Sequence, residues 1–287
     1  VSITRTMQDD GRFSLPDLAE IDQVIREHRP GAMVVIPYDN PTGQLYTREQ
    51  MADLARLCVE HGMWLISDEA YRELHYGDQL ATSVWALDEE QVPGIAGRRI
   101  SIETSSKVWN ACGLRIGALV TDNDAFHTQA VAENTASLCA NHIGQHIFGA
   151  LAHESHADLQ AWYGRQRAYY REMLVDLTEK TRRLLPGVIV SSPDATIYSV
   201  IDVRRIAAEQ FDALDFVIWS AREGRCLVDG RNLTLLTAPM SGFYSVPPGQ
   251  PNPGRTQMRI AYIERPENMQ LVPELLAELF DQYGQRA

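Results

Sequence analysis

The segment from Thr104 to Arg115 carries residues whose types and spacing suit covalent chemistry. Three hydroxyl residues, Thr104, Ser105 and Ser106, directly precede Lys107, and Arg115 follows the lysine by eight positions. A lysine in a partly desolvated site can lose its proton near neutral pH and form a Schiff base with an aldehyde. Hydroxyl groups and a guanidinium bind phosphate oxygens. The segment therefore suits an aldehyde that also carries a phosphate.

Pyridoxal phosphate is such an aldehyde, and its ring makes further demands on the chain. The ring nitrogen needs a carboxylate to stay protonated, so that the ring can act as an electron sink. Asp68 is the candidate partner, and Tyr71, three residues on, could reach the ring hydroxyl from the same turn. Asn40 could donate to that oxygen from an earlier loop. Each residue alone also has a structural explanation, since a lone Asp at a strand end is more often a helix cap.

These residues must be positioned by regular elements, and the first half of the chain alternates short apolar runs with amphipathic helices. We predict helices at 15–28 and 47–62, and strands at 32–38, 63–67, 98–104 and 114–121. Thr47 and Gln50 form a T-x-x-Q capping box at the start of the second helix. The alternation is typical of an α/β fold, a mostly parallel sheet with helices on both faces. Ligands bind at the carboxyl ends of such strands, where Asp68 and Lys107 fall.

A long helical pattern from His153 to Leu185 leads into a region with a different order of elements. We predict strands at 187–192, 196–203, 225–229 and 257–263, and helices at 211–224 and 267–284. Strands and helices without strict alternation indicate a smaller α+β domain. We therefore predict two domains, residues 1–164 and 165–287. Residues 1–5 also have the pattern of a strand.

Composition excludes several classes of function. The 287 residues have a net charge of −12, and the 26 Lys and Arg residues are scattered, which argues against a nucleic-acid partner. No apolar run is long enough for a membrane span, and no signal peptide is evident. The four cysteines show no metal or disulfide spacing, and the histidines no metal spacing. We expect a cytoplasmic protein with reduced thiols and no metal site.

Four motifs in order resemble the class I/II aminotransferases, the fold-type I enzymes that depend on pyridoxal phosphate. They are NPTG at 40–43, SDEAY at 67–71, TSSKVWNACGLRIG at 104–117 and RIAY at 259–262. The match covers nearly the whole chain. The resemblance implies a large cofactor-binding domain, a smaller C-terminal domain, and transfer of an amino group between an amino acid and a 2-keto acid. It also implies a homodimer.

The resemblance gives a role to each candidate residue that faces the cofactor ring. Lys107 would be the Schiff-base lysine and would later move a proton between the substrate's α-carbon and the cofactor. Asp68 would hold the ring nitrogen. Asn40 and Tyr71 would form hydrogen bonds with the ring oxygen.

The remaining roles concern the two anionic groups, the cofactor's phosphate and the substrate's carboxylate. Thr104, Ser106 and Arg115 would lie towards the phosphate. Arg259 would bind the substrate's α-carboxylate, a planar task that suits a guanidinium. A surface ion pair between Arg259 and Glu264 is the structural alternative.

The sequence also departs from the family pattern. The glycine-containing turn that binds the phosphate and the aromatic residue that stacks on the ring are not located, and the chain opens on Val1. We expect that roughly a hundred residues of the cofactor domain are absent. The substrate side chain is not readable, although Arg231 and residues 238–244 could face it.

Two other functions use the same motifs. Fold-type I enzymes also catalyse β-elimination or γ-elimination, as in C–S lyases, or oxidise and hydroxylate arginine-like substrates, and the motifs do not separate these reactions from amino transfer. A regulator of the MocR type, which joins a winged-helix DNA-binding domain to an aminotransferase-like sensor, is the alternative from another class.

Overall fold

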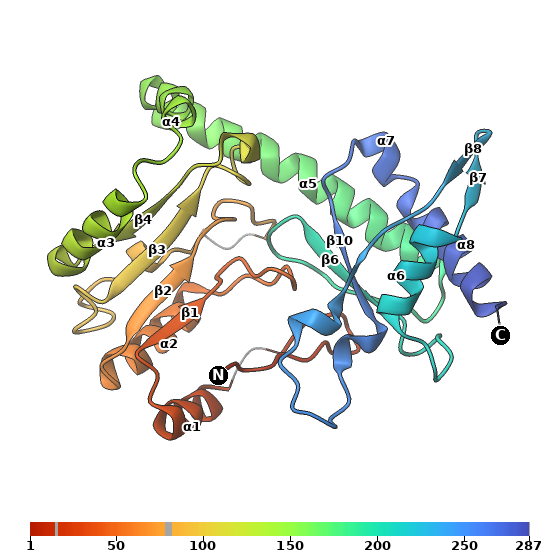
Figure 1. Cartoon of the computed structure of the whole chain (residues 1–287), viewed down its shortest axis with the longest axis horizontal. Coiled ribbons are helices and arrows are strands. Elements are labelled where there is room, and N and C mark those ends of the chain that lie inside the picture. The colour runs from red at the N-terminus through yellow and green to blue at the C-terminus, as the bar shows by residue number, and fades with distance from the viewer. Residues whose placement is uncertain (15–16, 78–81, 287) are drawn as a thin grey trace. The chain divides into compact units, whose positions relative to one another are not determined.

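A computed structural model describes residues 1–14, 17–77 and 82–286 of the chain (Figure 1). The chain divides into two compact units. The first unit comprises Pro16–Asp39 and Gln44–Arg167, and the second comprises Ser2–Leu15, Asn40–Gly43 and Ala168–Ala287. The units divide inside the long helix α5 (His156–Leu184). The division into domains 1–164 and 165–287 stays a prediction.

The first unit contains a four-stranded sheet in the order β1-β2-β3-β4, seen as adjacent arrows in Figure 1. Its strands are β1 (Ala32–Val35), β2 (Trp64–Asp68), β3 (Arg99–Thr104) and β4 (Gly117–Thr121). The first three strands run parallel, and β4 pairs antiparallel with β3. The predicted, mostly parallel sheet is therefore confirmed, and Asp68 and Thr104 are the last residues of β2 and β3.

Besides the start of α5, the described part of the first unit contains four α-helices: one precedes β1, one joins β1 to β2, and two follow β4. They are α1 (Leu18–His28), α2 (Arg48–Glu60), α3 (Asp124–Ala136) and α4 (His142–Gly149), with short 3₁₀ turns η1 (Val84–Ala86), η2 (Cys112–Leu114) and η3 (Ala150–His153). The predicted capping box begins α2: the Gln50 amide donates to Thr47 Oγ1 at 3.1 Å, and the Thr47 amide donates to Gln50 Oε1 at 2.8 Å.

Part of the first unit exposes apolar side chains. Helix α3 has no buried residue within the part of the chain that the structure describes. Leu119 and Val120 of β4 and Val131 of α3 are 44%, 40% and 51% exposed, and Ile143 of α4 is 72% exposed. Leu119 and Val120 are consecutive in β4 and therefore lie on opposite faces of the sheet. Exposed large apolar residues on several elements favour contact with another protein segment or chain.

The second unit contains an antiparallel sheet in the order β5-β6-β10-β9. Its strands are β5 (Ile189–Val190), β6 (Tyr198–Asp202), β9 (Ala238–Pro239) and β10 (Gln257–Ala261). The unit also contains a hairpin of β7 (Cys226–Val228) and β8 (Arg231–Leu233). Its further elements are the helices α6 (Ala213–Arg222), α7 (Pro266–Met269) and α8 (Val272–Gly284), and the turns η4 (Met240–Phe243) and η5 (Pro253–Thr256). Part of its core consists of Met7, Phe13, Ile189, Val200 and Met240.

Two predicted elements differ from the structure. Residues 1–5 form no strand: Val1 is 82% exposed, and the first paired residue is Met7, which bridges Phe13. An extended segment becomes a strand only where a partner takes up its backbone hydrogen bonds. The predicted helix 267–284 is two helices, α7 and α8. Pro273 lies in the first turn of α8, where its missing amide hydrogen costs nothing, whereas inside one continuous helix it would remove a hydrogen bond.

The four cysteines are free thiols that differ in accessibility, which predicts their order of reaction. Cys58 and Cys226 are buried, and Cys112 and Cys139 are exposed. Burial raises the pKa of Cys58 to about 12, so its reactive thiolate is scarce at neutral pH. We expect iodoacetamide to modify Cys112 and Cys139 in the native protein, and Cys58 and Cys226 only after denaturation. Peptide mass spectrometry measures this, and rapid native labelling of Cys58 would contradict the packing of α2.

The described residues include no helix that is both long enough and apolar enough to cross a lipid bilayer.

Candidate active site

The carboxyl end of β2 positions Asp68. The Asp68 carboxylate accepts a hydrogen bond from the Ala70 amide at 3.1 Å, and the Glu69 amide donates to the Ile102 carbonyl of β3 at 3.0 Å. The backbone ladder therefore continues one residue beyond the strand. Within the described residues, Asp68 forms no ion pair with a lysine or arginine. This half-buried carboxylate is free to accept a charged donor.

The carboxyl end of β3 positions the hydroxyl residues that precede Lys107. The Thr104 hydroxyl donates to Ser106 Oγ at 2.9 Å, and the Ser106 amide donates back to Thr104 Oγ1 at 3.1 Å. Ser105 is buried instead, and its hydroxyl lies 3.3 Å from the carbonyls of Ala111 and Ile116. The half-buried hydroxyls of Thr104 and Ser106 are therefore accessible to a ligand, whereas the buried Ser105 hydroxyl stabilises the loop.

Arg115 directly follows the turn η2 and lies two residues before β4, the strand that pairs with the end of β3. Thr104 pairs with Gly117 across β3 and β4, and the Ser105 amide donates to the Ile116 carbonyl at 3.3 Å. The backbone approach is close, because a Cβ on Gly117 would lie 2.6 Å from the Glu103 carbonyl oxygen. Arg115 is exposed and adopts a left-handed backbone with φ of 52°, and its guanidinium donates to the Cys112 carbonyl at 3.0 Å.

Lys107 is joined to the turn after β2 by an aromatic contact. Its Nζ lies 5.7 Å from the centroid of the Tyr71 ring. Tyr71 is 5% exposed, and Lys107 is half-buried. Among residues 1–14, 17–77 and 82–286, neither Lys107 nor Arg115 forms an ion pair. Two cations without carboxylate partners, beside a pair of hydroxyls, are a donor set that suits an anion.

The second unit holds the other predicted site residues, Asn40 and Arg259. The Arg259 guanidinium donates to Asn40 Oδ1 at 2.6 Å and lies 4.2 Å from the centroid of the Tyr198 ring and 5.1 Å from that of Phe243. Its Nε is buried with no hydrogen-bond partner in the described chain. Two aromatic faces and one amide therefore orient this guanidinium and leave it able to bind a carboxylate.

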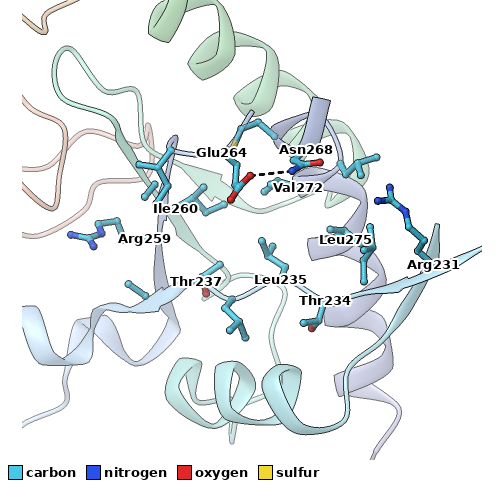
Figure 2. Close-up of a pocket in the computed structure, with 17 residues that line it drawn as sticks. Arg231, Thr234, Leu235, Thr237, Arg259, Ile260, Glu264, Asn268, Val272 and Leu275 are labelled. Atoms are coloured by element: carbon cyan, nitrogen blue, oxygen red, sulfur yellow. Dashed lines mark hydrogen bonds between the residues drawn. The ribbon is translucent and has the colours of Figure 1, made fainter. Parts of the chain in front are cut away.

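Arg259 and Glu264, the two residues of the alternative surface ion pair, both line a cavity of about 590 Å³ in the second unit. Figure 2 shows Glu264 in its lining, hydrogen-bonded to Asn268 Nδ2 at 3.0 Å, while the Arg259 guanidinium points away from the other labelled residues. No ion pair joins Arg259 to Glu264 among the described side chains. Arg231 also lines the cavity, as does Ala238 of the 238–244 segment.

The predicted site residues thus form two groups. The first unit brings together the ends of β2 and β3, with the residues Asp68, Tyr71, Thr104, Ser106, Lys107 and Arg115. The second unit joins Asn40 to Arg259. The aromatic partners of Arg259, Tyr198 and Phe243, were not found by the sequence reasoning. A sequence signal existed for Phe243 alone, because it lies in the 238–244 segment that was expected to face the substrate, and none existed for Tyr198 in β6.

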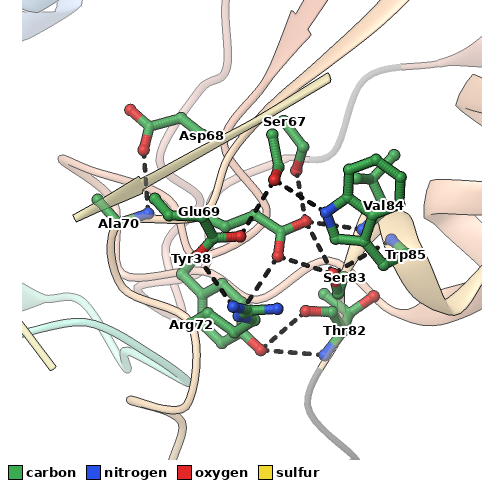
Figure 3. Close-up of polar contacts among 12 residues, drawn as sticks. Tyr38, Ser67, Asp68, Glu69, Ala70, Arg72, Thr82, Ser83, Val84 and Trp85 are labelled. Carbon is green, nitrogen blue, oxygen red and sulfur yellow. Dashed lines mark hydrogen bonds and ion pairs between the residues drawn. The ribbon is translucent and has the colours of Figure 1, made fainter. Parts of the chain in front are cut away.

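Sequence reasoning also missed a buried carboxylate, Glu69, which is only 2% exposed. It lies within the SDEAY motif, directly after Asp68, and Figure 3 shows it in the centre of a polar network. The available signal was an acidic pair at the end of an apolar strand. Alternation of side chains along a strand places only one of two neighbouring residues on each face of the sheet.

Comparisons with known proteins identify the family and the fold of the chain. Residues 7–228 match the family model described as aminotransferase class I and II. An aspartate aminotransferase of Streptomyces avermitilis is 24% identical over 191 residues, which cover 66% of this chain and 44% of that protein. A 2-aminoadipate transaminase of Thermus thermophilus is 29% identical over 173 residues, covering 60% of this chain and 42% of that protein.

Solved structures show the same fold. An N-succinyldiaminopimelate aminotransferase from Mycobacterium tuberculosis superposes with a TM-score of 0.76 at 20% identity, covering 97% of this chain and 65% of that one. The chain belongs to the class I and II aminotransferase family, whose cofactor is pyridoxal phosphate. It spans less than half the length of the two curated relatives named above.

The residues of the first unit fit this cofactor. Lys107 supplies an amine that is half-buried and has no carboxylate partner among the described residues, and Asp68 supplies a carboxylate without a cation. An aldehyde and a protonated ring nitrogen are the groups that would satisfy them. The Thr104–Ser106 hydroxyl pair and the Arg115 guanidinium suit the phosphate.

Proposed function

We propose that the protein carrying this chain is a pyridoxal-phosphate-dependent aminotransferase that moves an amino group between an amino acid and a 2-keto acid. One observation carries the proposal. Lys107 is half-buried over the Tyr71 ring, directly after the hydroxyls at the end of β3, and has no carboxylate partner in the described part of the chain; Asp68 ends the neighbouring parallel strand. This is the place where ligands bind in parallel sheets.

The cofactor, when bound, supplies an electron sink for chemistry at the substrate's α-carbon. Lys107 would hold it covalently, and the same Nζ would then move the proton at the α-carbon. Asp68 would keep a proton on the ring nitrogen. Tyr71 would bind the ring oxygen, and the phosphate would lie towards Thr104, Ser106 and Arg115 in the loops that flank Lys107.

The second unit would bind the substrate. Arg259 is oriented by Tyr198, Phe243 and Asn40, and its planar guanidinium suits an α-carboxylate. We propose Asn40 as a further donor to the ring oxygen, as the family resemblance implies, since its amide nitrogen is not used in the bond to Arg259. The named relatives act on aspartate and on 2-aminoadipate, which supports an amino-acid substrate for this protein.

The proposal is tested by supplying the whole protein with pyridoxal phosphate, a panel of amino acids and a 2-keto acid. Formation of the amino acid that corresponds to the keto acid, measured by mass spectrometry with a ¹⁵N-labelled donor, is the expected result. Release of ammonia from the donor without labelled product would instead assign the protein to the lyases. A protein that takes up no pyridoxal phosphate at all would refute the proposal.

Arg259→Lys is expected to raise KM for the amino-acid donor by about tenfold or more, because an ammonium cannot form the two parallel bonds of a guanidinium. Affinity for pyridoxal phosphate should be unchanged. Steady-state kinetics and a cofactor titration measure the two effects. Arg255→Lys is the matched control, since Arg255 is exposed and its guanidinium donates to the Glu209 carbonyl. An unchanged KM in the Arg259 variant would remove this residue from the substrate site.

We also propose that the protein is a homodimer in the cytoplasm. The exposed apolar side chains of β4, α3 and α4 support a second copy as a partner, because soluble proteins rarely leave such groupings uncovered. The scattered basic residues and the free thiols support the location. Sedimentation velocity of the whole protein tests the assembly, and a monomer at all concentrations would contradict it.

A further inference from the structure

The carboxylate of Glu69 is buried although nothing in the proposed chemistry uses it. Moving an ionised carboxylate out of water is costly unless several donors replace the water. Glu69 receives donors from two segments: Ser67 Oγ at 3.1 Å, Ser83 Oγ at 2.7 and 3.0 Å, and the Val84 amide at 2.7 Å (Figure 3). Burial raises the pKa of Glu69, and the donors from Val84 and Ser83 lower it.

Arg72 extends this cluster from β2 to β3. Its Nε lies 3.5 Å from Glu69 Oε2, and its other end donates to Glu103 Oε2 at 2.9 Å. The second oxygen of Glu103 accepts from Ser101 Oγ at 3.1 Å. Glu103 directly precedes Thr104, so a continuous chain of polar contacts runs from the end of one strand to the end of the next.

The cluster occupies the face of the sheet opposite to the candidate site. Side chains alternate along a strand, so Ser67 of β2 and Ser101 of β3, which are direct register partners, lie on one face. Asp68 and Thr104, at alternate positions, lie on the other. The backbone reinforces the arrangement, since the Glu69 amide donates to the Ile102 carbonyl.

The turn that follows Glu69 carries Tyr71. The Arg72 amide donates to the Glu69 carbonyl at 3.0 Å, which closes the turn, and the Arg72 side chain returns to the Glu69 carboxylate. The Tyr71 ring within this turn lies under Lys107. A movement of the Glu69 side chain would therefore displace both neighbours that face the proposed cofactor, Asp68 and Tyr71.

We propose that Glu69 is a positioning residue for the cofactor site. From the far face of the sheet it fixes the ends of β2 and β3 against the 82–86 segment, and so sets the placement of Asp68 and of Tyr71. Displacements of about 1 Å in such groups cost large factors in rate, which gives the buried carboxylate a role beyond stability. The inference rests on the proposed function, because it assigns Glu69 to that site.

Two variants of the whole protein test the role of Glu69. Glu69→Gln keeps the volume of the side chain but presents an NH₂ group to the Ser83 hydroxyl or the Val84 amide. Glu103→Gln weakens the bond to Arg72 at a less buried position. It tests the same polar cluster if Glu69→Gln does not fold. Asp22→Asn is the matched control.

The control carboxylate has a comparable set of partners in the same unit. Asp22 accepts from Arg26 at 2.7 Å and lies 2.7 Å from His61 Nε2, so it joins α1 to the end of α2, and neither of these bonds reaches β2 or β3. A purely structural role for Glu69 would make its variant resemble Asp22→Asn.

Three readouts separate positioning from stability. The first is the dissociation constant of pyridoxal phosphate, which we expect to rise about tenfold in Glu69→Gln. The second is the pH midpoint of the absorbance change of the bound cofactor, expected to rise by about half a unit, because a displaced Asp68 supports the positive ring nitrogen less well. The third is hydrogen exchange in the cofactor-free protein, where the amides of Glu69 and Ser105 should exchange faster.

The expected pattern is that both glutamine variants change all three readouts and that Asp22→Asn changes none, whatever its melting temperature. The inference is overturned if Glu69→Gln and Glu103→Gln, where folded, bind the cofactor with the affinity and pH midpoint of the wild type, or shift no more than the control. A wild-type protein that takes up no pyridoxal phosphate would overturn the proposed function, and this inference with it. Wild-type uptake with unaffected variants would overturn this inference alone.

Discussion

Replacing Lys107 by alanine is expected to abolish covalent retention of pyridoxal phosphate and to lower turnover by about four orders of magnitude or more. The physical reason is that the proposed reaction uses one amine twice, first to hold the aldehyde and then to move the α-proton. Lys107 suits both tasks because it is half-buried over Tyr71 and has no carboxylate partner among the described residues.

The lysine that binds the cofactor can be identified directly, because the chain contains two lysines, Lys107 and Lys180. Lys180 forms an ion pair with Asp176 on α5, at 3.0 Å. After borohydride reduction of the loaded protein, peptide mass spectrometry should find the cofactor mass on Lys107 alone. Lys180→Ala is the control and should leave both the labelling and the turnover intact. Turnover that survives Lys107→Ala would refute the assignment.

Asp68→Asn is expected to lower kcat by about two to four orders of magnitude while the protein still binds pyridoxal phosphate. An amide cannot hold a positive charge on the ring nitrogen, so the ring becomes a poorer electron sink. The fold should tolerate the change, because within residues 1–14, 17–77 and 82–286 Asp68 accepts one bond, from the Ala70 amide, and the Asn oxygen can accept the same bond.

Single-turnover kinetics of α-proton loss, followed with a deuterated donor, measure this effect apart from binding. Asp122→Asn serves as the control. Asp122 forms an ion pair with Arg99 where β3 begins and β4 ends, which is the end of this strand pair away from Thr104. Equal rates of proton loss in wild type and Asp68→Asn would remove Asp68 from the ring nitrogen. A loss of cofactor binding without a change in rate would assign Asp68 to binding instead.

Local chemistry explains why many elements were predictable from the sequence. The start of α2 follows from Thr47 and Gln50, whose side chains satisfy amides that no helix can satisfy for itself. The strands β2 and β3 follow from short apolar runs that end in polar residues. Where pairing partners decide the outcome, prediction failed: residues 1–5 have a strand pattern but no partner strand.

The candidate site divides in the same way. The types and spacing of Asp68, Lys107 and Arg115 identified cofactor chemistry, because the demands of an aldehyde, a phosphate and a ring nitrogen are specific to residue type. The contact between Lys107 and Tyr71 joins the segments that follow two different strands, β3 and β2, and no local pattern encodes it. The same holds for Arg259, whose partners Tyr198 and Asn40 are far away along the chain.

The sequence by itself determined the chemistry that the chain can support, the family it resembles and most of its helices and strands, because these depend on residue type and on neighbours a few positions apart. Only the tertiary structure decided that Glu69 is buried while Asp68, its neighbour, stays available on the other face. The physical reason is that burial and long-range hydrogen bonds depend on which strand ends meet, and the register of β2 with β3 sets that meeting.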